Sequence, residues 1–178
     1  KPGCQGKVVS DDFSGCKACF ELGVTEVGCM AHARRKFHEL WVNHGSQVGE
    51  QALKFFSALY DVEREVADAD SQTRLDARRR SRPVADALHQ WMRLQRQKIP
   101  DGSATAQAID YSLNRWVALT RFLDDGDLPI DNNWVENRIR PIALGRQNWL
   151  FAGSLRAGNR AAAAMSLIHS AKLNGLDP

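Results

Sequence analysis

Residues 24–43, VTEVGCMAHARRKFHELWVN, change from strand periodicity to helix periodicity within one short stretch. The segment VTEVGC has the alternation of a short strand, whereas the apolar residues after it recur at helical spacing, at Met30, Phe37, Leu40 and Trp41. A strand followed directly by an amphipathic helix is half of the repeating unit of α/β proteins. The stretch therefore predicts that this part of the chain belongs to an α/β fold.

The residues before this stretch repeat the same order. The run GKVVSDD, residues 6–12, predicts a short buried strand whose carboxyl end presents Asp11. Residues 14–22 predict a short helix, and Gly23 follows it as a suitable C-cap. The order strand, helix, strand, helix predicts that the two strands are parallel, because a helical crossover returns the chain to the same end of the sheet.

Beyond this segment the strand pattern stops, and residues 45–125 predict a block of helices. Pro83 is tolerated in the first turn of the second helix, Ser103 is suited to cap the third, and Gly126 follows the block. We therefore predict an α/β core at residues 1–44, a large helical insertion at 45–126, and a return to the core at 127–178, with helix predominant overall. Apolar residues mark the three helices at Leu53, Phe56, Leu59, Tyr60 and Val66, at Val84, Leu88, Trp91 and Met92, and at Ile109, Leu113, Trp116, Leu119 and Phe122.

The segment DNNWVENRIRPI, residues 131–142, predicts one more helix. Asp131 is a suitable N-cap, the helix would cover residues 132–140, and Pro141 would interrupt or end it. Spacing of three and four residues places Glu136 and Arg140 on one face, whereas Val135 and Ile139 would face the core. Glu136 is therefore expected to be accessible.

Basic residues are concentrated in segments of this 178-residue chain, although its formal net charge is only +3. Residues 72–98 contain eight Lys or Arg against two acids, and residues 133–160 contain five Arg against Glu136 alone. Such segments suit a polyanion, nucleic acid first, with solvated helix faces as the alternative. The basic and aromatic candidates for phosphate contact and base stacking are Arg34, Arg35, Lys36, Arg78, Arg79, Arg80, Arg82, Arg138, Arg140, Arg146, Trp149 and Arg156.

Composition predicts a globular protein of the reducing cytosol. No run approaches the roughly 18 apolar residues of a membrane span, and the first residues lack an apolar signal region. All four cysteines lie within the first thirty residues, which is unlike the disulfide framework of a small secreted fold. The pairs Cys16 with Cys19 and Cys29 with His32 have zinc-ligand spacing, with ordinary packing as the alternative.

Asp11 at a strand end and Glu136 on a distant helix form a candidate metal site. Carboxylates from separate elements are typical ligands of Mg²⁺, which keeps open positions for phosphate oxygens. Spacing alone does not separate this site from a routine surface pair of Glu136 with Arg140.

Four segments together resemble the transposases of the insertion sequence 66 family: SDDFSG, VGCMAHARRKFHEL, IDNNWVENRIRPIALGRQNWLFAGS and SLIHSAKLNGLDP. The resemblance implies a retroviral-integrase-like catalytic domain of the ribonuclease H fold, in which two aspartates and one glutamate hold two Mg²⁺ or Mn²⁺ ions. It assigns Asp11 as the second aspartate and Glu136 as the glutamate. It further implies that the ions activate water, and later a DNA 3′-hydroxyl, to attack phosphodiester bonds at transposon ends and in target DNA.

The sequence departs from the family pattern in ways that limit these expectations. The first aspartate would lie upstream of Lys1, so we expect a C-terminal fragment of a longer bacterial transposase that is inactive alone. Asp12 replaces a usual glycine and is a minor ligand candidate. Cys29 and His32 belong to a family motif, and we expect packing and a hydrogen bond there rather than zinc.

The resemblance also implies partners and further site residues. DNA is the expected partner, together with other copies of the protein and accessory proteins of the same element. The alternative is a non-catalytic nucleic-acid-binding or assembly module. Residues expected to orient the site or the DNA backbone are Asn133, Asn137, Arg140, Arg146, Arg34, Arg35 and Trp149.

Overall fold

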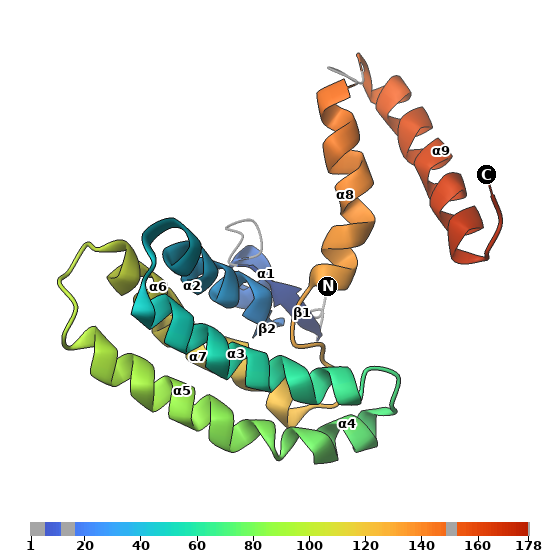
Figure 1. Cartoon of the computed structure of the whole chain (residues 1–178). Helices are drawn as coiled ribbons and strands as arrows, with labels where there is room; N and C mark the ends of the chain where they lie inside the picture. Colours follow the sequence, from blue (N-terminus) through green and yellow to red (C-terminus); the bar gives the residue numbers. More distant parts are fainter. Residues whose placement is uncertain (1–5, 12–16, 149–152, 178) are drawn as a thin grey trace. The chain divides into compact units, whose positions relative to one another are not determined.

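The computed structural model describes residues 6–11, 17–148 and 153–177. The chain divides into two compact units, Lys1–Asn132 and Asn133–Pro178. Helix predominates in both units, as the sequence predicts (Figure 1). The ribonuclease H-like assignment and the three-part division at residues 44 and 126 stay predictions.

The first unit contains the parallel strand pair that the sequence predicts. Strand β1 (Lys7–Ser10) pairs with β2 (Thr25–Gly28) in parallel, in a register that runs from Lys7 opposite Thr25 to Ser10 opposite Gly28. Helix α1 (Lys17–Glu21) connects the strands, and Gly23 N donates to Phe20 O at 3.1 Å just after it. The predicted start of this helix, near residue 14, lies outside the described residues.

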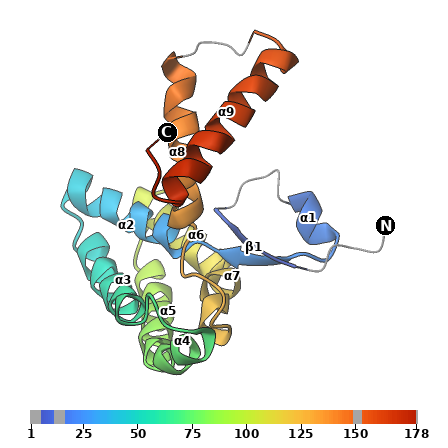
Figure 2. The ribbon, with the colours of Figure 1, turned by 90° about the vertical axis from the view of Figure 1, so that its right-hand side faces the viewer.

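Four long helices of the first unit pack in a ring around a shared core. Helix α3 (Gln47–Glu65) packs against both α2 (Met30–His44) and α5 (Ser81–Arg96), and α6 (Ala104–Asn114) closes the ring by packing against α2 and α5 (Figures 1 and 2). The predicted helical block therefore shares its core with α2 and β2. Its fully buried members include Val27, Met30, Phe37, Phe56, Leu59, Leu88, Met92, Ile109, Leu119 and Phe122.

Side-chain caps begin several helices of this unit. The Ser46 hydroxyl accepts from Gly49 N at 3.2 Å at the start of α3, and the Ser103 hydroxyl accepts from Ala106 N at 3.1 Å at the start of α6. Asp70 accepts from Thr73 N at 2.8 Å and begins α4 (Ser71–Arg78), a helix that the sequence analysis did not predict. The segment has few apolar residues and no amphipathic stripe, which is the feature that predicts the other helices.

The third helix of the predicted block is not continuous, so that prediction was wrong. Arg115 leaves helical geometry at φ −106° and ψ 11°, and the chain continues as α7 (Trp116–Thr120) and the 3-10 helix η2 (Arg121–Asp124). The break lets α7 pack directly against β2: a Cβ on Gly28 would lie 2.9 Å from Leu119 N. Tertiary packing therefore overrides the helical periodicity of the segment.

The second unit consists of α8 (Asn133–Asn148) and α9 (Leu155–Leu173), with Ser154 accepting from Ala157 N at 3.2 Å as the cap of α9. Two predictions were wrong here. Helix α8 continues through Pro141, because a proline removes one backbone donor and strains the helix without obliging it to end. Val135 and Ile139 are 48% and 52% exposed rather than buried in a core, and no described residue of α9 is buried.

Within the ranges 6–11, 17–148 and 153–177, each helix is too short or too polar to cross a lipid bilayer.

Candidate active site

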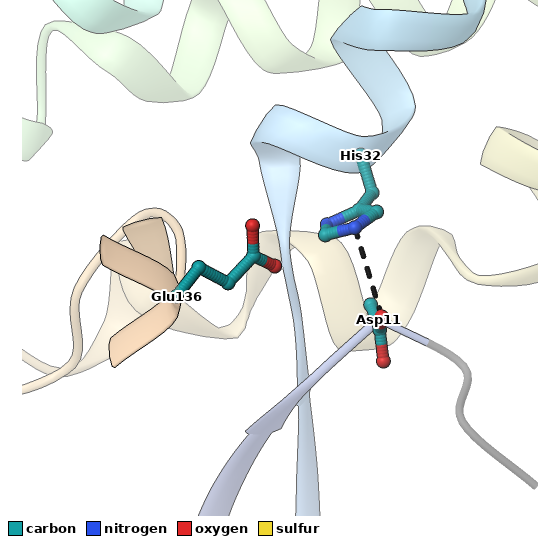
Figure 3. Close-up of side chains that lie close together, drawn as sticks. All are labelled: Asp11, His32 and Glu136. Atoms are coloured by element: carbon teal, nitrogen blue, oxygen red, sulfur yellow. Dashed lines mark ion pairs between the residues drawn. The ribbon is translucent and has the colours of Figure 1, made fainter. Parts of the chain in front are cut away.

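Asp11 and His32 lie side by side at the carboxyl end of the strand pair. Asp11 directly follows β1, and His32 lies in the first turn of α2, which begins two residues after β2 ends. Because the carboxyl ends of parallel strands meet at one edge of a sheet, the two side chains approach each other. His32 Nε2 lies 3.7 Å from Asp11 Oδ2, the pair joined by the dashed line in Figure 3.

This pair has a donor set that suits a divalent cation. The Asp11 side chain is 43% exposed, whereas that of His32 is only 18% exposed, so the carboxylate faces solvent from a partly buried setting. Carboxylate oxygen is the preferred protein ligand of Mg²⁺, and imidazole nitrogen suits transition metals better than Mg²⁺. The residues present therefore fit a Mg²⁺ or Mn²⁺ ion that keeps open positions for other oxygens. Asp12, the minor ligand candidate, lies outside the described residues.

The segment just before α8 is hydrogen-bonded to the rest of the first unit through three consecutive residues. Ile130 O accepts from Met30 N at 3.0 Å, at the start of α2. Asn132 Oδ1 accepts from the Cys29 thiol at 2.9 Å. Asp131 Oδ2 accepts from a hydroxyl of α3, that of Tyr60, at 2.7 Å. The sequence analysis placed Asp131 as the cap of the next helix, but α8 begins at Asn133, one position later than that prediction.

Tyr60 is the member of this arrangement that the sequence analysis missed as a functional residue. Its position in the apolar stripe of α3 is a packing signal, and its ring packs against the core. Burial, together with the charge and hydrogen bond of Asp131, raises the pKa of Tyr60, so its hydroxyl stays protonated and donates. Burial likewise raises the pKa of the Cys29 thiol, which keeps it a donor to Asn132.

Glu136, also drawn in Figure 3, belongs to the second unit and lies in the first turn of α8. Its side chain is half-buried, whereas Asn133, Asn137 and Arg140 on the same helix are exposed. A carboxylate in the first turn of a helix is stabilised by the unpaired backbone N–H groups there.

Comparison with known proteins identifies the family. A family model described as "Transposase IS66 family" matches residues 2–160. The chain belongs to the IS66 family of transposases. No solved structure is significantly similar to it.

Relatives of this IS66-family chain occur in Sinorhizobium fredii. The uncharacterized protein y4hP is 34% identical over 194 residues, which cover 99% of this chain and 35% of that protein. The uncharacterized protein y4jD is 40% identical over 151 residues, which cover 84% of this chain and 30% of that protein. The chain thus spans about a third of the length of the curated relatives it matches.

The predicted phosphate-binding arginines of this IS66-family chain differ in their surroundings. Arg34, Arg35 and Lys36 are exposed on α2, and Lys36 Nζ lies 4.5 Å from the centre of the Tyr111 ring. Arg138 stacks over Trp134 at 5.0 Å in the second unit. The described residues do not include Trp149, and the side chain of Arg146 is likewise outside the description.

The arginine run at residues 78–82 does not form the free basic surface that the sequence predicts. Arg78 is fully buried, so its assignment to phosphate contact was wrong. The neighbouring arginines are engaged at the surface by acids of the same unit: Arg79 pairs with Asp76, Arg80 with Glu65, and Arg82 with Asp124. A basic run in sequence therefore does not give a basic patch here.

The described residues do not test the zinc alternative. The Cys29 thiol is free and buried, and it donates to Asn132 Oδ1. Cys16 and the side chain of Cys19, the other proposed ligands, are not among the described atoms.

Proposed function

We propose that this chain is part of a DNA transposase in which Asp11 and Glu136 hold Mg²⁺ or Mn²⁺ for phosphodiester hydrolysis and strand transfer at transposon ends. Membership of the IS66 family supports transposition as the activity. The assignment of residues rests on the pairing of Asp11 with His32, which lies in the first turn of α2. The motif residues just before Glu136 contact the start of the same helix.

Chain connectivity supports the participation of Glu136. Asn132 is hydrogen-bonded to Cys29, and His32 lies one helical turn after Cys29. Glu136 lies four residues after Asn132, a rise of roughly 6 Å along a helix. The family resemblance assigns Glu136, in the motif that contains this hydrogen-bonded residue, as the glutamate of the site.

Each residue has a distinct role in this proposal. Asp11 and Glu136 supply oxygen ligands, and His32 orients the Asp11 carboxylate or adds a nitrogen ligand. A bound divalent ion would polarise the phosphodiester and lower the pKa of the attacking hydroxyl or water. Asp12 is a minor ligand in this scheme, and the first aspartate of the triad would come from the additional length that the relatives possess. Phosphate and base contacts come from Asn133, Asn137, Arg140, Arg146, Arg34, Arg35 and Trp149.

The fold, the partners and the cellular location that we propose follow from the same family assignment. The catalytic core is ribonuclease H-like, interrupted by the helices of residues 45–126. Its partners are transposon-end and target DNA, further copies of the protein, and accessory proteins of the element, in the bacterial cytoplasm.

Strand transfer by the full-length protein tests the proposal. Labelled transposon-end DNA is incubated with wild type, Asp11→Asn and Glu136→Gln in Mg²⁺ and in Mn²⁺. Each substitution removes one charged ligand, and we expect the rate to fall at least about a hundredfold, because a bound metal contributes several kcal/mol to such reactions. Glu50→Gln, the same change on the exposed face of α3, is the matched control and should retain full activity.

Retained activity in Glu136→Gln would overturn the assignment of residues. A wild-type protein that binds DNA but neither cleaves nor joins it in either metal would instead favour the alternative, a binding or assembly module.

A further inference from the structure

We infer that Tyr60 is a positioning residue of the transposase site: its hydroxyl holds Asp131 and thereby fixes the start of the helix that carries Glu136. The inference rests on the proposed function and deepens it, because it assigns part of the catalytic geometry to the helical block of residues 45–126.

Tyr60 is well suited to hold another group in place. Its ring packs against the core, on a helix that packs along both α2 and α5. A side chain fixed in this way loses little further freedom when it makes a hydrogen bond, so its hydroxyl defines one point in space. That point is 2.7 Å from Asp131 Oδ2.

Asp131 is the middle residue of the three-residue anchor described above. Ile130 and Asn132, on either side of it, are bonded to Met30 N and to the Cys29 thiol at the start of α2. The backbone bond at Ile130 fixes the chain direction, but it leaves the next residues free to rotate. The two side-chain bonds restrict that freedom in the last two residues before α8, and the bond from Tyr60 comes from the helical block.

The consequence for catalysis is geometric. Asp131 lies two residues before α8, and Glu136 lies in the first turn of that helix, so a small rotation at Asp131 moves the Glu136 carboxylate by a larger distance. Misplacement of a reacting group by about 1 Å costs on the order of a hundredfold in rate. Loss of the Tyr60 hydroxyl should therefore slow the chemical step, whereas DNA affinity, which depends on phosphate contacts elsewhere, should not change.

The test compares Tyr60→Phe with Tyr111→Phe in the full-length protein. The chain has only these two tyrosines, and both are half-buried on helices of the same unit, so the second is a matched control. We expect Tyr60→Phe to lower the cleavage rate at saturating transposon-end DNA by about tenfold to a hundredfold, with the DNA Kd within twofold of wild type. Tyr111→Phe should keep the wild-type rate.

Substitutions of Asp131 separate positioning from a general loss of structure. Asp131→Asn keeps an acceptor oxygen for the tyrosine and should stay closer to wild type than Asp131→Ala. In the Asp131→Ala background, Tyr60→Phe should cause no further loss, because its partner is already absent. If Tyr60→Phe fails to fold, as judged by circular dichroism, the comparison of Asp131→Asn with Asp131→Ala still decides: equal rates overturn the inference.

Absorbance of the tyrosinate gives a readout independent of activity. In the 178-residue chain that carries Tyr111→Phe, Tyr60 is the one tyrosine left, and Asp131→Ala should shift its ionisation to lower pH. An unchanged titration would show that the hydrogen bond is absent in solution and would overturn the inference.

The two proposals fail in different ways. Wild-type activity in Glu136→Gln overturns the proposed function. Inactivity of Glu136→Gln combined with wild-type rates in Tyr60→Phe overturns the positioning role alone.

Discussion

Arg78 Nη2 donates to Glu63 Oε2 at 2.6 Å, and Arg78 Nε donates to Glu63 Oε1 at 2.7 Å, in a place where the arginine side chain has no exposed area. The remaining nitrogen, Nη1, donates to two backbone carbonyls, those of Phe122 and Asp125, at 2.8 Å each. One guanidinium therefore joins α4, α3 and the end of η2. Its donors are matched to carboxylate and carbonyl oxygens, as burial of such a charge requires.

Removal of this guanidinium should strongly destabilise the protein. In Arg78→Met, the Glu63 carboxylate would be left in a mostly buried place without its cation, and loss of one partner of a buried pair costs about 3–5 kcal/mol. Urea unfolding measures this difference in the free energy of unfolding. Arg79→Ala, at the next position but 81% exposed, is the control and should change that free energy by less than about 0.5 kcal/mol. Equal effects of the two substitutions would contradict the structural role of Arg78.

The contrast between Arg78 and Arg79 shows why the sequence misleads in this segment. Adjacent arginines have the same composition signal, but α4 directs one into the protein and the other into solvent. The helix itself was missed, because it lacks an apolar stripe. Where local signals are strong, prediction succeeds: the β-branched runs became β1 and β2, and Ser103 caps a helix.

In the candidate site, the position of Asp11 follows from local sequence signals, whereas the pairing of Tyr60 with Asp131 does not. Asp11 stands out because it follows a strand, and parallel pairing then fixes the edge at which it lies. The partnership of Tyr60 with Asp131 joins residues 71 positions apart in the sequence, and it depends on how α3 packs on α2. No periodicity records that packing, so a tyrosine in an apolar stripe is indistinguishable from an ordinary core residue.

The salt dependence of DNA binding should distinguish exposed arginines from paired ones. Each phosphate contact adds about 0.9 to the slope of log K against log salt concentration, because it releases counterions. We expect Arg34→Ala and Arg35→Ala each to reduce the slope by up to about one, since both side chains are exposed on α2. Arg80→Ala, which removes a partner of Glu65, should leave the slope unchanged. If all three variants kept the wild-type slope, Arg34 and Arg35 of α2 would be excluded from the DNA-binding surface.

Acid should weaken the link between β1 and the segment after η2. The Lys7 ammonium donates to Asp125 Oδ2, and this bond, with a second from Asp127 N, holds the pKa of Asp125 below its ordinary value. Because the folded-state pKa is the lower one, the stabilisation is fully present above about pH 4 and is lost as the pH falls through the folded-state value. Asp125→Asn and Lys7→Met should each flatten the loss of unfolding free energy in acid, measured by urea unfolding from pH 5 downward. Acid profiles identical to wild type would show that the bond contributes nothing.

Metal binding should depend on the two proposed carboxylates even where no DNA is present. Binding of Mn²⁺ to the full-length protein can be followed by the electron paramagnetic resonance signal of the free ion. We expect Asp11→Asn and Glu136→Gln each to weaken binding at least about tenfold, because each replaces a charged oxygen ligand by a neutral amide. Asp68→Asn, a change of the same kind at an exposed position, is the control.

His32→Gln tests whether the imidazole is itself a metal ligand. If it is, the substitution should weaken Mn²⁺ binding more than Mg²⁺ binding. If His32 only orients the Asp11 carboxylate, the substitution should weaken the binding of both ions alike, because that carboxylate binds either metal. Full retention of Mn²⁺ affinity in the Asp11→Asn, Glu136→Gln double variant would mean that the metal, if one is bound, has other ligands.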